Sequence, residues 1–244
     1  MHLNEITKTD PKYWKSRYIN RLDPEGKPPD HPTEEMAEER FAKVLPLLKK
    51  HCKEIIRTYR KAGRVLNRGA RGRGKDIFVA GIRPDRRPGY LEKEMHQAEA
   101  IAVKKLGGVA NRTNSIFCTN NVAIARDWGD DVYVVFPKDG WSVTFFPKLN
   151  YGYVYDELTY LEAAYHDAKN DGEFNGKKDP GKLAHDATMV MKLYRRLGVN
   201  FKKSQLPGFI MKKQNLEVLI SGNSYIALER AKYLPLINKY LLGK

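Results

Sequence analysis

Glu217 is the side chain whose setting in this sequence most clearly points to chemistry. It is a single carboxylate within "NLEVLISGNSY", a run that suits a β-strand and ends in a turn at Ser221-Gly222-Asn223. One interpretation is an edge strand whose acid faces water. The other is that the strand is a rigid platform that directs Glu217 at a substrate.

Two further segments place polar groups at the ends of short apolar runs. Arg68 stands in "VLNRG", and Thr119 and Asn120 stand in "IFCTNNVAIA". A guanidinium can bind a phosphate through two parallel hydrogen bonds, and a hydroxyl or an amide can orient a neighbouring group. The alternatives are a basic Arg/Gly loop that follows nucleic-acid phosphates for Arg68, and a helix cap for Thr119 and Asn120.

The order of these segments resembles that of the arginine–serine–glutamate mono-ADP-ribosyltransferases. In that family a first strand carries "RG", a second carries a serine-threonine-serine motif, and a late strand carries the catalytic glutamate. The matching pieces here are Arg68-Gly69, "CTN" at 118–120 and "EVLI" at Glu217, and the likeness spans about residues 64–228. The middle block, "RPDRRPG…IFCTNN…ARDWG…VYVVFP", also resembles uncharacterised bacteriophage-encoded proteins.

The resemblance implies NAD-dependent transfer of ADP-ribose to a macromolecule, with NAD as the substrate and no metal. Cleavage of the nicotinamide–ribose bond passes through a sugar cation, which Glu217 would stabilise. The resemblance also implies that Arg68 and Gly69 bind the pyrophosphate, while Thr119 and Asn120 orient the glutamate or the ribose.

Two positions depart from the family's pattern. Cys118 stands where the first serine would be, and a thiol is a weak hydrogen-bond donor. Asn215 stands two residues before Glu217, where arginine-modifying members carry Glu or Gln, which argues against arginine as the acceptor. These departures favour the competing hypothesis of a non-catalytic, basic nucleic-acid-binding or virion-associated protein with a degenerate transferase fold.

The segment "NFKKSQLPGFIMKKQ" lies just ahead of Glu217, where the resembling family places its acceptor-recognition loop. Its basic side chains surround an apolar tip and are Lys202, Lys203, Lys212 and Lys213. They imply an anionic acceptor, either an acidic patch of a host protein or RNA or DNA; the alternative is a loop that lysines merely keep soluble. Arg86, in "RPDRRP", is an alternative anion-binding residue for the NAD site.

The composition describes a folded, strongly basic protein. The 244 residues carry 44 Lys+Arg against 29 Asp+Glu, and a net charge of +15 attracts polyanions such as nucleic acid. Two cysteines and six scattered histidines favour neither a disulfide framework nor a metal site. Without an apolar run that could span a membrane or form a signal peptide, we expect a cytoplasmic protein, in the host cytoplasm or virion-associated if phage-encoded.

The order of predicted elements indicates an α+β domain. Residues 1–32 read as an irregular arm, and 33–244 as one domain made of N-terminal helices (33–63), a core that would bind NAD (64–228) and a C-terminal helix (229–244). Alternating helices and strands predict a mixed or antiparallel sheet flanked by helices, similar to the fold of the ADP-ribosyltransferases.

Local signals predict several boundaries within this domain. The N-terminal helical segment should begin at a Thr33 cap, split or kink at Pro46 and stop at Gly63. Further helices are predicted at 90–106, 156–168 and 183–197, and a strand followed by a short helix within 114–129. Two β-hairpins are predicted, one at Asp139-Gly140 and one at the turn after Glu217.

Overall fold

The computed structural model describes residues 34–71, 75–85, 93–147, 156–160, 180–212 and 215–244. The predicted arm at 1–32 and the Thr33 cap lie outside these residues. The chain divides into a unit of residues 1–40 and a unit of residues 41–244, and every strand belongs to the second. None of the described helices combines the length and the apolar character needed to cross a membrane.

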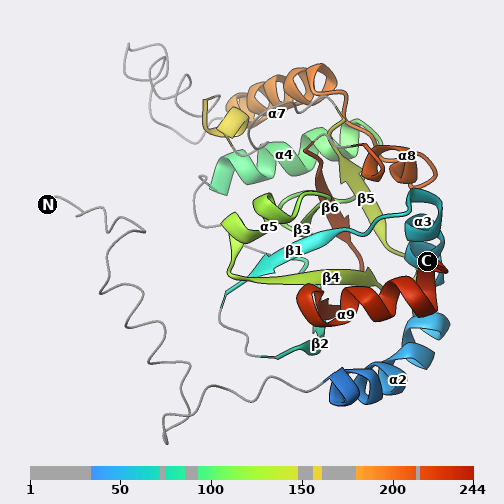
Figure 1. Cartoon of the computed structure of the whole chain (residues 1–244). Helices are drawn as coiled ribbons and strands as arrows, with labels where there is room; N and C mark the ends of the chain where they lie inside the picture. Colours follow the sequence, from blue (N-terminus) through green and yellow to red (C-terminus); the bar gives the residue numbers. More distant parts are fainter. Residues whose placement is uncertain (1–33, 72–74, 86–92, 148–155, 161–179, 213–214) are drawn as a thin grey trace, which may run out of the picture. The chain divides into compact units, whose positions relative to one another are not determined.

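The second unit is built on a seven-stranded antiparallel sheet in the described part of the chain (Figure 1). Its order is β2–β7–β4–β1–β3–β6–β5. The strands are β1 (Asn67–Ala70), β2 (Ile77–Gly81), β3 (Ser115–Thr119), β4 (Asp131–Pro137), β5 (Ser142–Phe145), β6 (Glu217–Ser221) and β7 (Ser224–Glu229). The α+β prediction is confirmed at this level.

Both predicted hairpins are wrong in their pairing. β4 pairs with β1 and β7, whereas β5 pairs with β6 at the far edge of the sheet. The turn between them is held elsewhere, because Asp139 N donates to His51 O (2.7 Å) and Asp139 Oδ1 accepts from Glu54 N (2.8 Å). β6 and β7 likewise take different neighbours, although only Gly222 and Asn223 join them.

The N-terminal helices are α2 (Glu34–His51) and α3 (Lys53–Ala62). Pro46 lies inside α2, so the predicted split at Pro46 is wrong; the break falls at Cys52, whose φ and ψ are −127° and 33°. Hydrogen bonding nevertheless continues across the break, since Cys52 N donates to Leu48 O (2.9 Å) and Ile56 N donates to Cys52 O (3.1 Å). α3 ends as predicted at Gly63, in the left-handed conformation (φ 62°).

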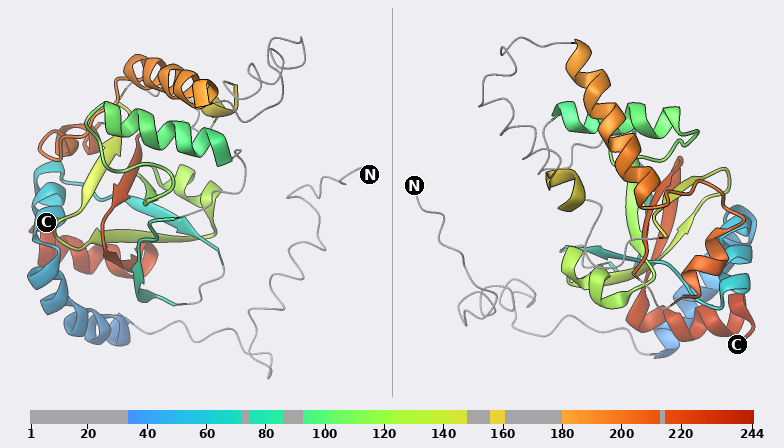
Figure 2. Two further views of the ribbon diagram at one scale, coloured as in Figure 1. Left: turned by 180° about the vertical axis from the view of Figure 1, so that it is seen from behind. Right: turned by 90° about the horizontal axis from the view of Figure 1, so that it is seen from above.

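Two helices cover β3 and β6 on one face of the sheet (Figure 2). They are α4 (Lys93–Lys105), which confirms the predicted helix at 90–106, and α7 (Pro180–Arg196), which confirms that at 183–197. Leu219 of β6 is buried with Val103 of α4 and Tyr194 of α7 in one apolar cluster. Of the predicted helix at 156–168, residues 156–160 are helical and the rest lie outside the described residues.

Shorter helices complete the unit. They are α5 (Val122–Trp128), α8 (Leu206–Ile210), α9 (Arg230–Ile237) and a π-helical turn, η2 (Asn238–Leu242). The N-cap of α5 is Asn121, and not Thr119 or Asn120, because the Asn121 Oδ1 accepts from Ala123 N (2.9 Å). α3 packs between α8 and η2, which holds α3 at one side of the unit.

Candidate functional site

Glu217 is buried in the interior of the sheet. It is the first residue of β6, which lies between β3 and β5, so the edge-strand interpretation is wrong. Its side chain is 4% exposed, and Arg112 Nη1 donates to its Oε1 at 3.0 Å. A carboxylate at this depth requires such a partner, because removing an unpaired charge from water costs several kcal/mol.

Arg112 lies at the centre of a buried polar cluster. Its backbone N–H donates to both carboxylate oxygens of Glu99 on α4 (3.3 Å each), while the Tyr194 hydroxyl of α7 donates to Glu99 Oε1 (2.6 Å). The guanidinium carbon lies 4.6 Å from the centre of the Phe117 ring. The cluster therefore joins α4, α7, β6 and the turn before β3.

The electrostatics of the cluster follow from one cation facing two acids. Burial raises the pKa of Glu99 to about 7, although the nearby Arg112 acts to lower it. Burial by itself would lower the pKa of Arg112. Glu217 and Glu99 raise this pKa by more than burial lowers it, so the guanidinium stays charged. The cluster thus stabilises the fold, because the Arg112 guanidinium neutralises the buried Glu217 carboxylate.

Thr119 lies beside Glu217, as the resemblance requires. The two residues are cross-strand partners of β3 and β6, so their side chains share one face of the sheet. β1, β3 and β6, the three strands that carry the matching pieces, are also neighbours in the sheet. The Thr119 hydroxyl, however, accepts from Asn121 N (3.1 Å) at the start of α5.

Arg68 does not join this pair. Asn67 is the cross-strand partner of Thr119, so Arg68, the next residue of β1, faces the opposite side of the sheet. Its Nη1 donates to Phe117 O (3.1 Å), and its charge acts on Cys118, whose pKa burial raises to about 12. The expectation that Arg68 and Glu217 line one cleft is therefore wrong.

Gly69 has a packing role in place of the predicted cofactor contact. A Cβ built on Gly69 would lie 1.8 Å from Ala125 O of α5, and one built on Gly129 would lie 2.4 Å from the backbone carbon of Ala70. β1 and α5 thus touch backbone to backbone through two glycines. The backbone of α5 therefore occupies the side of Gly69 that a side chain would take.

Asn120 acts as a clamp on the chain that leads into β6. Its Nδ2 donates to Ile210 O (3.3 Å) and Lys212 O (2.9 Å), and its Oδ1 accepts from Leu216 N (3.1 Å). Asn215, which departs from the family's pattern, accepts from Asn121 Nδ2 (2.8 Å). These amides bind protein backbone and each other, so their sequence-predicted contact with a ligand gains no support from the geometry.

The basic segment ahead of β6 is held against α3. Lys203 Nζ contacts Glu54 Oε2 (2.6 Å) and lies 5.1 Å from the centre of the Trp141 ring, while Lys202 is exposed. Lys212 Nζ lies 4.8 Å from the centre of the Phe209 ring. The other two basic candidates of the sequence analysis, Arg86 and Lys213, lie outside the described residues.

The outer face of α3 is strongly cationic. Its exposed residues are all cations: Lys53, Arg57, Arg60 and Lys61. Its buried residues, Ile55, Ile56, Thr58, Tyr59 and Ala62, face the core. This cationic face was not predicted, although the recurrence of Lys and Arg at every exposed position is visible in the sequence.

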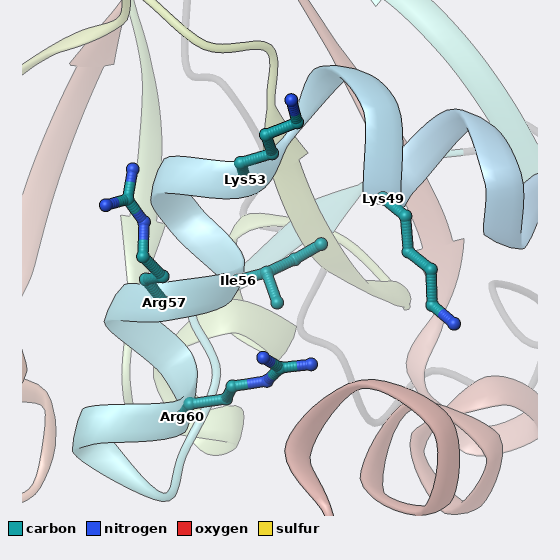
Figure 3. Close-up of a pocket in the computed structure, with 5 residues that line it drawn as sticks. All are labelled: Lys49, Lys53, Ile56, Arg57 and Arg60. Atoms are coloured by element: carbon teal, nitrogen blue, oxygen red, sulfur yellow. The ribbon is translucent and has the colours of Figure 1, made fainter.

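A hollow of about 320 Å³ lies along this face. It is lined by Lys49, Lys53, Ile56, Arg57 and Arg60. Figure 3 shows Lys49 and Arg60 reaching toward the same space, with Ile56 between them, whereas Arg57 extends from the other side of α3. Arg60 is fixed in place, because its Nε donates to Leu241 O (2.6 Å).

The described residues contain no cluster of His, Cys, Asp and Glu side chains that could hold a metal ion. Comparison with known proteins finds no matching family model, no similar curated protein and no similar solved structure.

Proposed function

We propose that this protein binds nucleic acid through the cationic face of α3 and the hollow beside it. The observation that carries the proposal is that every exposed side chain of α3 is a lysine or an arginine. Phosphates are the ligands that such a face attracts, since Lys and Arg that neutralise them release condensed counterions.

Three further features support a phosphate-binding role. Glu54 is the one acid of α3, and Lys203 neutralises it at 2.6 Å. Arg60 is oriented by Leu241 O, so its guanidinium is partly pre-organised for an anion. The whole chain carries a charge of +15, which speeds encounters with polyanions. Binding of this kind requires no catalysis.

Neutralising α3 tests the proposal directly. The variant Lys53→Gln/Arg57→Gln/Lys61→Gln is expected to weaken DNA binding at least ~10-fold at moderate salt and to reduce the slope of log K against log [salt] by about 3, since each lost phosphate contact removes about 0.9. Arg60 is retained because it bonds Leu241. Fluorescence anisotropy with a labelled DNA measures both quantities.

A matched control removes the same charge elsewhere. Lys104→Gln/Lys105→Gln/Lys192→Gln takes three exposed lysines from α4 and α7. It should keep most of the affinity and the salt slope. Equal losses in the two variants would mean that net charge alone attracts DNA, and the assignment to α3 would be wrong.

The second candidate is NAD-dependent transfer of ADP-ribose to a macromolecular acceptor. It is favoured by the register that sets Thr119 beside Glu217 on adjacent strands. It requires Arg112 to release the carboxylate, because Glu217 is 4% exposed and paired in the structure. Arg68 faces the other side of the sheet and contributes nothing to a ribose site beside Glu217.

Nicotinamide release tests this candidate. The wild-type protein and Glu217→Gln are incubated with labelled NAD and a cell lysate, and free nicotinamide and transferred label are measured. If the candidate holds, both signals appear with the wild type and vanish with Glu217→Gln. Glu54→Gln is the control, because it removes another ion-paired carboxylate, at 2.6 Å from Lys203. Absence of both signals with the wild type excludes the candidate.

A further inference from the structure

We infer that the nucleic acid bound by α3 is a duplex, contacted through its phosphates, and not a single strand. The inference rests on the proposed function and specifies its partner. Proteins that bind single strands without sequence preference combine a basic groove with aromatic side chains on which the bases stack. A face made of cations alone recognises phosphates and gains nothing from exposed bases.

The residues of α3 and of the hollow include no exposed aromatic side chain. None of the residues that line the hollow is aromatic. Tyr59 is the one aromatic residue of α3, and it is fully buried, with its hydroxyl donating to Val135 O (2.5 Å). It packs edge-on against Phe136 with ring centres 5.6 Å apart. The single aromatic side chain of α3 therefore packs in the core and not on the basic face.

Three of the cations form a row along α3. Lys53, Arg57 and Lys61 follow one another at intervals of four residues, so their Cα atoms are about 6 Å apart along the helix axis. α3 is fixed by its buried face, by α8 on one side and by η2 on the other. Such a row suits the phosphates of a stiff duplex, which do not lose conformational freedom when they bind.

The cations around α3 point in different directions. Arg60 and Lys49 reach to one side of α3, and Arg57 extends to the other (Figure 3). A duplex carries one charge per about 1.7 Å of its axis, counted over both strands, so cations on both sides of α3 meet a dense array of phosphates. A single strand supplies half that charge density and must lose conformational freedom to follow the helix.

The test compares one sequence in three forms. A labelled 20-nucleotide DNA is measured as each single strand and as the duplex, and an RNA duplex of the same sequence distinguishes the two sources of paired phosphates. We expect at least one duplex to bind ~10-fold or more tightly than either strand. With four cations engaged, the salt slope should be about −3.6, because each contact on B-DNA contributes about −0.9.

Each outcome bears on a different claim. Single strands that bind as tightly as both duplexes, or more tightly, overturn the inference and leave the proposed function intact. Failure of every form to bind removes the proposed function as well. The variant Lys53→Gln/Arg57→Gln/Lys61→Gln adds a second readout, since it should lose more affinity for the preferred duplex than for the strands; equal losses would again contradict the inference.

Discussion

Replacing Arg112 by methionine is expected to lower the free energy of unfolding by about 3–5 kcal/mol at pH 8. The substitution keeps an unbranched side chain of similar length but leaves Glu217 and Glu99 buried without their cation. Chemical denaturation followed by circular dichroism measures the loss. A variant within about 1 kcal/mol of the wild type would show that the two carboxylates are not held as the structure describes.

The loss should depend on pH with a definite sign. Burial raises the pKa of Glu99 to about 7, above its ordinary value of 4.5, so the folded state binds this proton more tightly than the unfolded state. The stability that Glu99 contributes is therefore complete in acid and falls as pH rises from about 4.5 to 7. Without Arg112 the pKa rises further, and the variant should recover part of its stability at pH 5.

Two controls separate burial from ion pairing as such. Arg196→Met removes an even shorter pair with Glu157 (2.6 Å), but these side chains are 68% and 37% exposed, so the expected loss is below about 1 kcal/mol. Adding Glu99→Gln to Arg112→Met should restore part of the stability at pH 8, because glutamine can still accept from Tyr194 without a charge.

Replacing Gly69 by alanine is expected to destabilise the protein by about 3 kcal/mol or more. The new methyl carbon would lie 1.8 Å from Ala125 O and 2.7 Å from Gly129 N, both backbone atoms that no rotamer change can move. β1 and α5 would have to separate, and β1 lies in the middle of the sheet. Thermal unfolding measures the effect as a large fall in Tm.

Gly208 provides the matched control. It lies inside α8, and a Cβ built on it meets no atom within 4 Å. Gly208→Ala should therefore be neutral or stabilise the protein by about 0.5–1 kcal/mol, since alanine loses less backbone entropy in a helix. Similar losses in the two variants would mean that the close approach of β1 and α5 is not what requires Gly69.

Elements that depend on local signals were predictable from the sequence. α4, the short helix α5 and the stop at Gly63 all follow from periodicity and capping chemistry within a few residues. Strand pairing was not predictable from the same signals. The turns at Asp139-Gly140 and at Gly222 are real turns, but their flanking strands pair with segments far away in the chain.

The candidate site also contains features that the sequence predicts and features that it does not. The register of Thr119 with Glu217 agrees with the order of the matching pieces, whereas the partner of Glu217 could not be foreseen. Arg112 lies 105 residues away in a turn without periodicity, and nothing local marks it as a buried cation. The cationic face of α3 could have been read directly, because it needs only the spacing of Lys and Arg along one helix.

The separation of consecutive strands has a consequence for how the chain reaches its folded state. Among the named strands, β2 pairs only with β7 and β5 pairs only with β6. Neither edge strand can therefore pair until residues 217–229 are present. A growing chain cannot complete either edge until that stretch has left the ribosome. Such distant pairings slow folding and leave Ile77–Gly81 and Ser142–Phe145 exposed as unpaired strands during synthesis.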